Sequence, residues 1–176
     1  MLRTATALGA LALATVAIFP SHAAERATAR LADPQGGDLG TVTLMPLAAG
    51  GVLLSAELRN VPPGTHGFHI HGTGQCDGAG GFESAGGHFN PSDNAHGWNN
   101  ADGPHAGDLP NIHVPEGGAL DIELFVPDVS LDEADENTLL GESGTAILIH
   151  AMADDYASDP SGMAGDRIAC GVIEAE

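Results

Sequence analysis

The chain has 176 residues, 24 of them acidic, with five arginines, no lysine and a formal net charge of −19. This balance excludes the basic surface that nucleic-acid binding needs, and the length suits one domain with a single core. With 25 glycines, 11 prolines and few aromatic residues, the composition favours short strands joined by turns. We therefore expect one all-β domain with no nucleic-acid partner.

The first 23 residues have the organisation of a secretory signal peptide. Arg3 supplies a positive start, residues 8–19 form a short apolar run, and Ser21 to Ala23 offer a small-residue cleavage site. We expect residues 1–23 to be removed, leaving a periplasmic or secreted domain, residues 24–176, with no membrane attachment. The alternative is an uncleaved membrane anchor. Export would also let Cys76 and Cys170 form a disulfide.

Alternating apolar residues predict strands along most of the remaining chain. Residues 39–58 contain two such runs, which predict a hairpin with its turn at Gly50 and Gly51. Further runs lie at residues 112–126, 145–150 and 167–173. The pattern predicts seven or eight antiparallel strands in a sandwich or barrel, with long loops at residues 72–111 and 151–166.

Six of the nine histidines fall within residues 66–108. Residues two apart in a strand share a face, so His69 and His71 are expected to point together. Imidazole ligands suit copper and zinc, and a carboxylate can complete a tetrahedral zinc site. These ligands could form two metal sites, one of three histidines and Asp108 and one of imidazoles alone, provided that the two sites share one ligand. The candidate ligands are His69, His71, His88, His96, His105, Asp108 and His150. His66 and His113 lack a partner at such spacing and are expected to be structural.

Several motifs resemble the copper/zinc superoxide dismutase family: GFHIH, GGHFNP, the spacing of His96, His105 and Asp108, GDLPN, AILIH and DRIACGVI. The five-residue step from His71 to Cys76 and the signal peptide are similar to the bacterial periplasmic branch. The resemblance covers residues 24–176 and implies an eight-stranded Greek-key barrel with a metal-binding and an electrostatic loop. It also implies superoxide as substrate, and relatives include monomers and homodimers.

The resemblance further implies the metal ligands and the reaction. Copper would be bound by His69, His71, His88 and His150, and zinc by His88, His96, His105 and Asp108. His88 would bridge the two metals and deliver a proton. Superoxide would reduce Cu(II) and leave as dioxygen, and a second superoxide would reoxidise Cu(I) and leave as hydrogen peroxide.

Three further residue roles follow from the resemblance. Arg167 would guide the anion to the copper, and the disulfide between Cys76 and Cys170 would tie the loop to the strand beside it. Asp154 would link the copper ligand His69 to the zinc ligand His96.

One departure concerns anion guidance, because residues 151–166 carry four aspartates and no basic residue, whereas many relatives have lysines there. Local attraction predicts that the rate falls with salt, and net repulsion predicts that it rises.

The alternative function is a non-catalytic periplasmic protein that binds or buffers copper and zinc. Storage needs neither a bridging histidine nor Arg167, so their presence argues against it. A copper chaperone is disfavoured because the chain has no Cys-x-Cys motif.

The acidic composition predicts a response to salt. If it reflects adaptation to high salt, screening of carboxylate repulsion should raise the melting temperature steeply as salt rises into the molar range. A melting temperature that stays flat over that range would contradict this interpretation.

Overall fold

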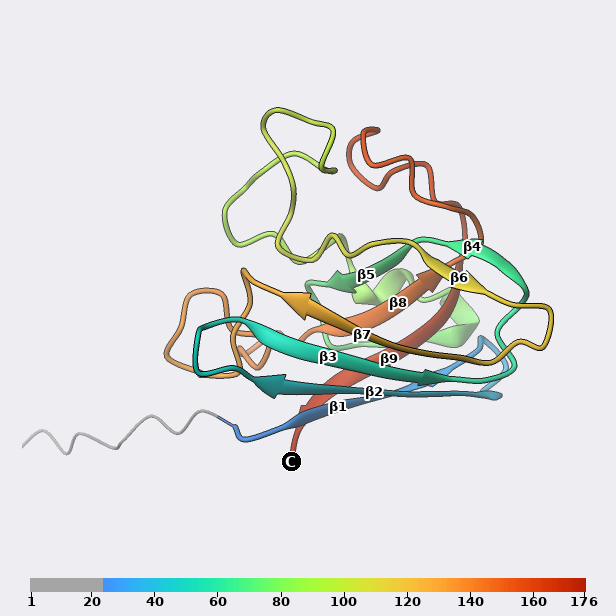
Figure 1. The fold of residues 1–176 in the computed structure, drawn as a ribbon, viewed down its shortest axis with the longest axis horizontal. Coiled ribbons are helices and arrows are strands. Elements are labelled where there is room, and N and C mark those ends of the chain that lie inside the picture. Colours follow the sequence, from blue (N-terminus) through green and yellow to red (C-terminus); the bar gives the residue numbers. More distant parts are fainter. Residues whose placement is uncertain (1–23) are drawn as a thin grey trace, which may run out of the picture.

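A computed structural model describes residues 24–176, and the expected signal peptide, residues 1–23, lies outside them (Figure 1). Strands are the main regular structure of the described chain, and turns and loops make up most of the rest. The strands are β1 (Ala27–Ala32), β2 (Asp38–Pro46), β3 (Val52–Leu58), β4 (Gly64–His66), β5 (Phe68–His71), β6 (Ile112–Val114), β7 (Leu120–Val126), β8 (Ala146–His150) and β9 (Arg167–Ala175). Two short 3-10 helices, η1 (Gly78–Gly80) and η2 (Glu83–Ala85), interrupt the first long loop. The all-β prediction is confirmed.

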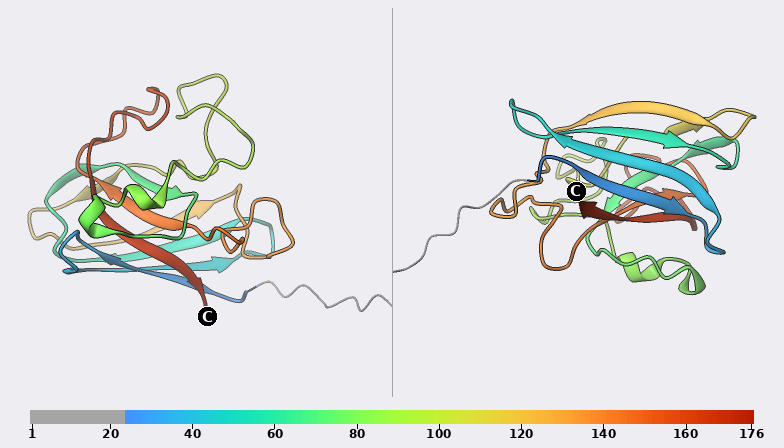
Figure 2. Two further views of the ribbon diagram at one scale, coloured as in Figure 1. Left: turned by 180° about the vertical axis from the view of Figure 1, so that it is seen from behind. Right: turned by 90° about the horizontal axis from the view of Figure 1, so that it is seen from below.

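Seven strands form one antiparallel sheet in the order β5-β8-β9-β1-β2-β3-β7, and β4 pairs with β6 in a second sheet. The large sheet curls around the core into a half-barrel (Figure 2). The predicted hairpin is present, because Pro46 pairs with Val52 and residues 47–51 form the turn. The first and last strands of the chain are neighbours in the large sheet, because β1 pairs with β9.

The alternation of the strands produces the core. Leu44, Leu54 and Leu124 lie opposite one another on β2, β3 and β7, and the first two are fully buried. The residues that alternate with them along each strand, such as Glu123 on β7, face solvent. Burying one such leucine side chain stabilises the fold by about 1.5 to 3 kcal/mol. A closed apolar core of this kind gives the metal ligands a rigid support.

The structure has nine strands where the pattern predicts seven or eight, and one reason is a break between two consecutive strands. Gly67 separates β4 from β5. Its amide donates to the carbonyl of Met152, and its carbonyl accepts from the amide of His150. A Cβ atom at this position would lie 2.9 Å from the Cβ of Ala164, so a glycine is needed where the two chain segments meet.

The two long loops leave the same side of the barrel and lie next to each other (Figure 1). Residues 72–111 form no strand within the described chain, as the sequence predicts. A disulfide between Cys76 and Cys170 ties this loop to β9, with Cα atoms 5.7 Å apart. No helix in the described part of the chain is long and apolar enough to cross a membrane.

The disulfide closes a chain segment of 94 residues, so its removal should destabilise the protein. On the chain-entropy model we expect the double variant Cys76→Ala, Cys170→Ala to lose about 4 to 5 kcal/mol of unfolding free energy. Chemical denaturation of the two proteins at the same metal content measures this. A loss below about 1 kcal/mol would contradict a stabilising cross-link.

Candidate metal centre

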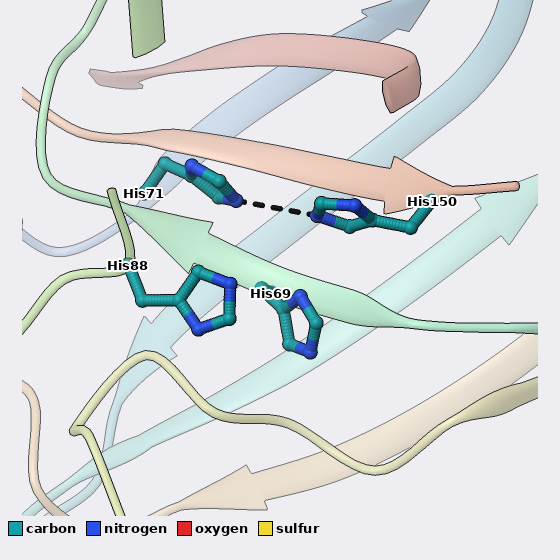
Figure 3. Close-up of side chains that lie close together, drawn as sticks. All are labelled: His69, His71, His88 and His150. Carbon is teal, nitrogen blue, oxygen red and sulfur yellow. Dashed lines mark hydrogen bonds between the residues drawn. The ribbon is translucent and has the colours of Figure 1, made fainter. Parts of the chain in front are cut away.

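The fold brings together all seven residues that the sequence singles out as ligands. They form two buried groups that share one member: an all-imidazole group of His69, His71, His88 and His150, and a mixed group of His88, His96, His105 and Asp108. Within each group, the ligand atoms all lie within 4.8 Å of one another. Figure 3 shows the all-imidazole group, with His69 and His71 on β5 and His150 at the end of β8.

Backbone pairing explains why distant ligands meet. The strand β5 pairs with β8 on one side, and His71 and His69 form isolated bridges with His88 and Asp108 on the other. Ile70 donates its amide to Gly107 and accepts the amide of Phe89, so both parts of the loop are fixed to β5. A Cβ atom at Gly107 would collide with the carbonyl oxygen of Ile70, which requires glycine there.

The all-imidazole group is arranged to receive a cation. His71 donates from Nδ1 to the carbonyl of Gly86 (2.9 Å), and His150 donates from Nδ1 to the carbonyl of Gly165 (3.2 Å). In the neutral rings, each Nε2 therefore carries a lone pair, and these two atoms face each other at 3.4 Å. The Nδ1 atom of His69 and the Nε2 atom of His88 are buried without any hydrogen-bond partner. Four lone pairs directed at one place fit a metal ion.

The mixed group fits a second cation for a similar reason. Oxygen Oδ1 of Asp108 lies 2.8 Å from Nδ1 of His88, 3.1 Å from Nδ1 of His96 and 3.2 Å from Nδ1 of His105. The other oxygen, Oδ2, accepts the amides of Gly97 and His105 and is thereby held in place. Three imidazoles and one carboxylate are a ligand set that zinc accepts.

Asp154 connects the two ligand groups through hydrogen bonds to one histidine of each. Its Oδ2 accepts a hydrogen bond from Nε2 of His69 (2.8 Å), and its Oδ1 accepts one from Nε2 of His96 (3.0 Å). A carboxylate can only accept, so both rings carry their proton on Nε2 and turn the Nδ1 lone pair towards the ligand groups. A Cβ atom at Gly162, whose φ is +66°, would collide with Oδ1 of Asp154, so this contact also depends on a glycine.

Burial keeps three of the ligand histidines neutral. It lowers the pKa of His71 to about 2 and that of His150 to about 3, with the charges of neighbouring histidines adding to the effect. Burial also lowers the pKa of His88 to about 4, although its hydrogen bond with Asp108 acts in the opposite direction. At neutral pH these three rings are therefore available as metal ligands.

The two carboxylates stay ionised in spite of their burial. Burial raises the pKa of Asp154, but hydrogen bonds from His69, His96 and Tyr156 outweigh it and bring the value to about 2. Burial acts in the same way on Asp108, and the hydrogen bonds from His88 and Gly97 hold its pKa well below the usual range. Both side chains can thus compensate the charge of a bound cation.

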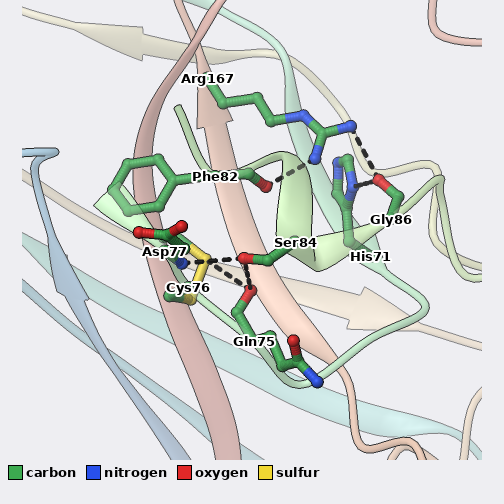
Figure 4. The surroundings of a disulfide bond; sticks show 9 residues. His71, Gln75, Cys76, Asp77, Phe82, Ser84, Gly86 and Arg167 are labelled. Atoms are coloured by element: carbon green, nitrogen blue, oxygen red, sulfur yellow. Dashed lines mark hydrogen bonds between the residues drawn. A yellow bond between two sulfur atoms is a disulfide. The ribbon is translucent and has the colours of Figure 1, made fainter. Parts of the chain in front are cut away.

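A cleft of about 680 Å³ leads to the all-imidazole group, and Arg167 lies on its wall with His71, His88 and His150. The guanidinium of Arg167 donates to the carbonyls of Phe82 and Gly86, each at 2.7 Å (Figure 4). The Gly86 carbonyl also accepts from His71, so one peptide group positions both side chains. The loop that supplies these carbonyls is the one anchored by the disulfide at Cys76.

Sequence reasoning missed some residues around the site. Glu83 lies 3.7 Å from Arg167 as an ion pair at the cleft, and nothing in the local pattern distinguishes it from other surface acids. Asn111 exchanges two hydrogen bonds with the backbone of Asp154, and only the GDLPN motif pointed to its neighbourhood. His66 and His113 belong to neither group, in agreement with the prediction: His66 bonds to backbone carbonyls, and His113 bonds to Thr65.

Comparisons with known proteins agree with this geometry. Residues 38–173 match the family Copper/zinc superoxide dismutase (SODC). A copper–zinc superoxide dismutase of Aquifex aeolicus is 45% identical over 83% of this chain and 86% of its own length, and one of Caulobacter vibrioides is 43% identical over 84% and 85%. The crystal structure of a superoxide dismutase-like protein from Bacillus subtilis matches with a TM-score of 0.79 and 39% identity, covering 82% of this chain and 96% of that one.

The fold and the two linked ligand groups define a β-barrel metalloprotein. The chain belongs to the copper/zinc superoxide dismutase family. It is an enzyme that disproportionates superoxide, and its cofactors are copper and zinc. The predicted family, fold class, cofactors and disulfide are thereby confirmed.

The lowered pKa values predict how acid affects the metal-free protein. An unfolded histidine has a pKa near 6.5, whereas burial lowers the pKa values of His88, His150 and His71 to about 4, 3 and 2 in the fold. Between pH 6.5 and 4 the unfolded chain therefore binds more protons, and stability must fall as the pH falls. Each ring contributes up to about 1.4 kcal/mol per pH unit to this decrease in the free energy of unfolding.

Urea denaturation of the metal-free protein at several pH values measures this slope. His71→Asn should reduce this slope by up to about 1.4 kcal/mol per pH unit, and His113→Gln, which changes an exposed ring outside both ligand groups, is the control. An unfolding free energy that is constant from pH 6.5 to 4 would contradict buried neutral histidines.

Proposed function

We propose that the all-imidazole group holds copper and the mixed group holds zinc, with His88 bound to both. The observation that carries this assignment is the orientation of one ring. Nδ1 of His88 faces Asp108 at 2.8 Å, whereas its Nε2 is buried and free of any hydrogen bond on the side of His69, His71 and His150. Zinc has no redox chemistry, so at the mixed group it would fix the ring of His88.

The chemistry that copper supplies when bound is a one-electron relay between two superoxide ions, one oxidised to dioxygen and the other reduced, with two protons, to hydrogen peroxide. Nε2 of His88 would pass on one of the two protons, because this nitrogen can take up a proton from water whenever it is not a metal ligand; the second proton would come from water directly. This atom is suited to the role because it is the only nitrogen of the ring that faces the all-imidazole group and is not held by Asp108. The fold also keeps His69 and His96 in one tautomer through Asp154.

Arg167 would bind the superoxide anion. Its side chain is only 14% exposed, and two backbone carbonyls hold the guanidinium on the wall of the cleft beside His71, His88 and His150. A guanidinium presents several donors in a fixed plane, so it can bind a small anion while keeping these two bonds. Arg167 thus provides positive charge in a cleft that also contains Glu83 and Asp166.

We further propose that residues 24–176 are one exported domain in the periplasm or outside the cell, with residues 1–23 as a cleaved signal. The apolar run of the leader and its small-residue cleavage site support this. The disulfide between Cys76 and Cys170 is consistent with an oxidising compartment.

A non-catalytic protein that binds or buffers copper and zinc is the second candidate. In this chain, both ligand groups and the arginine of the cleft are present, and storage requires no anion site.

The assay that separates these functions is superoxide disproportionation by the copper- and zinc-loaded protein. We expect a high rate for the wild type, a loss of at least about a hundredfold for His88→Ala, and a loss of about tenfold or more for Arg167→Ala. Arg167→Lys, which retains the charge but not the planar donors, should fall between. An inactive wild type with both metals bound would leave only the binding function.

The ion pair at the cleft predicts a gain of activity. Glu83 is exposed and lies 3.7 Å from Arg167, so Glu83→Gln should remove a charge that opposes the approaching anion. We expect kcat/KM to rise by about two- to threefold at low salt, because one charge is a small part of a steering field worth roughly 10- to 1,000-fold. The increase should vanish as salt screens the charges.

Glu123→Gln is the matched control, because this glutamate faces solvent on β7 away from the cleft. If the two variants respond to salt in the same way, local guidance by the Arg167 region is wrong. If the wild-type rate rises with salt, net repulsion by the acidic chain dominates.

A further inference from the structure

A pair of stacked aromatic rings joins the two long loops next to the mixed group. Trp98, the only tryptophan of the chain, follows His96 by two residues, and Tyr156 follows Asp154 by two residues. Their ring centroids lie 5.2 Å apart, and the ring planes differ by 19°. Trp98 is nevertheless 47% exposed, so the stack is a contact at the surface that can open without disturbing the core.

All three polar groups of Tyr156 form hydrogen bonds, and two of them reach the other loop. Its amide donates to Oδ1 of Asp154 at 2.6 Å, and its carbonyl accepts the amide of Asn99 at 2.9 Å. Its hydroxyl accepts the amide of Asn111 at 2.8 Å. The residue adopts a φ of 60°, which a tyrosine rarely takes, so these contacts hold it in an unfavourable backbone conformation.

The same contacts fix Asp154. Tyr156 and His96 share the Oδ1 atom of Asp154, and Asn111 holds the Asp154 backbone through its side-chain amide, at 2.8 and 2.9 Å. The tautomer of His96, and with it the lone pair on Nδ1, therefore depends on a carboxylate whose position Tyr156 and Asn111 determine. Trp98 covers one face of Tyr156 and so stabilises this arrangement from the other loop.

We propose that Trp98 and Tyr156 form a latch that controls how fast zinc leaves the protein, and that both are positioning residues. This inference rests on the assignment of zinc to the mixed group. His96, His105 and Asp108 come from one loop with little apolar content, so zinc escapes when this loop moves away from β5. Such a movement separates the loop from residues 151–166, and the stacked rings must part before His96 can leave Asp154.

The test is the rate at which the fully loaded protein transfers zinc to an excess of a coloured zinc chelator at neutral pH. Trp98→Ala should release zinc roughly three- to tenfold faster than the wild type, the scale of one aromatic pair. Trp98→Phe, which retains a ring, should restore most of the slow release. Tyr156→Phe should also accelerate release, because it removes the acceptor for the Asn111 amide.

Phe125→Ala is the control, since Phe125 is 59% exposed on β7 and contacts neither long loop through any ring pair in the described chain. It should leave zinc release unchanged. The melting temperatures of the metal-free proteins provide the second readout. The latch predicts similar values for Trp98→Ala and Phe125→Ala, whereas a merely structural role predicts a lower melting temperature without faster release.

Two results would overturn the proposal, and they are distinguishable. If wild-type protein holds one zinc ion per chain and Trp98→Ala releases it as slowly as Phe125→Ala, the latch is wrong and the zinc assignment stands. If metal analysis finds no zinc retained by the loaded wild type, the zinc assignment fails and the latch fails with it.

Discussion

The structure of the site depends on the orientation of one imidazole ring. His88 lies between two groups of ligands, with Nδ1 towards Asp108 and Nε2 towards the other three imidazoles. Its side chain is 2% exposed, so neither nitrogen can turn to water instead. Each nitrogen of this buried ring therefore needs a partner within the protein or a bound metal, because a buried polar atom without a partner is energetically costly. The remaining contacts around the site serve to keep both sides in place.

These contacts come from parts of the chain that are far apart in sequence. The carboxylate of Asp154 connects His69 to His96, β8 brings His150 beside β5, and the disulfide holds the loop whose carbonyls orient His71 and Arg167. The segment with most of the histidines is therefore insufficient alone. Only the complete seven-stranded sheet, in which β9 pairs with both β8 and β1, completes the site. The polar loop is anchored to a rigid barrel, and this anchoring holds its ligand side chains in place, which the loop could not do by itself.

Much of the molecule follows from local sequence patterns. The alternation in β2, β3 and β7 predicts a half-buried sheet, and the period of two in a strand predicts that His69 and His71 share a face. Local patterns do not show which distant residues bind the same metal, and this assignment rests on the resemblance of the motifs to the family. The division at Gly67 was not predictable, because it results from the close approach of Met152 and Ala164, which are distant in sequence.

Residues that act through long-range contacts were missed for the same reason. Glu83 becomes an ion-pair partner of Arg167 only because the disulfide-linked loop folds back over β9. Tyr156 and Trp98 lie in loops with no periodic signal, and their stacking depends on how two loops pack together. Periodicity reports which face of a strand is buried, and it carries no information on which loops meet.

The most direct test of the shared ring is the electron paramagnetic resonance spectrum of Cu(II) in the protein, recorded with and without zinc. If His88 binds both metals, removing zinc should change the copper spectrum of the wild type, and the spectrum of His88→Ala should be insensitive to zinc. A wild-type copper spectrum that is identical with and without zinc, at one copper ion per chain, would contradict a common histidine.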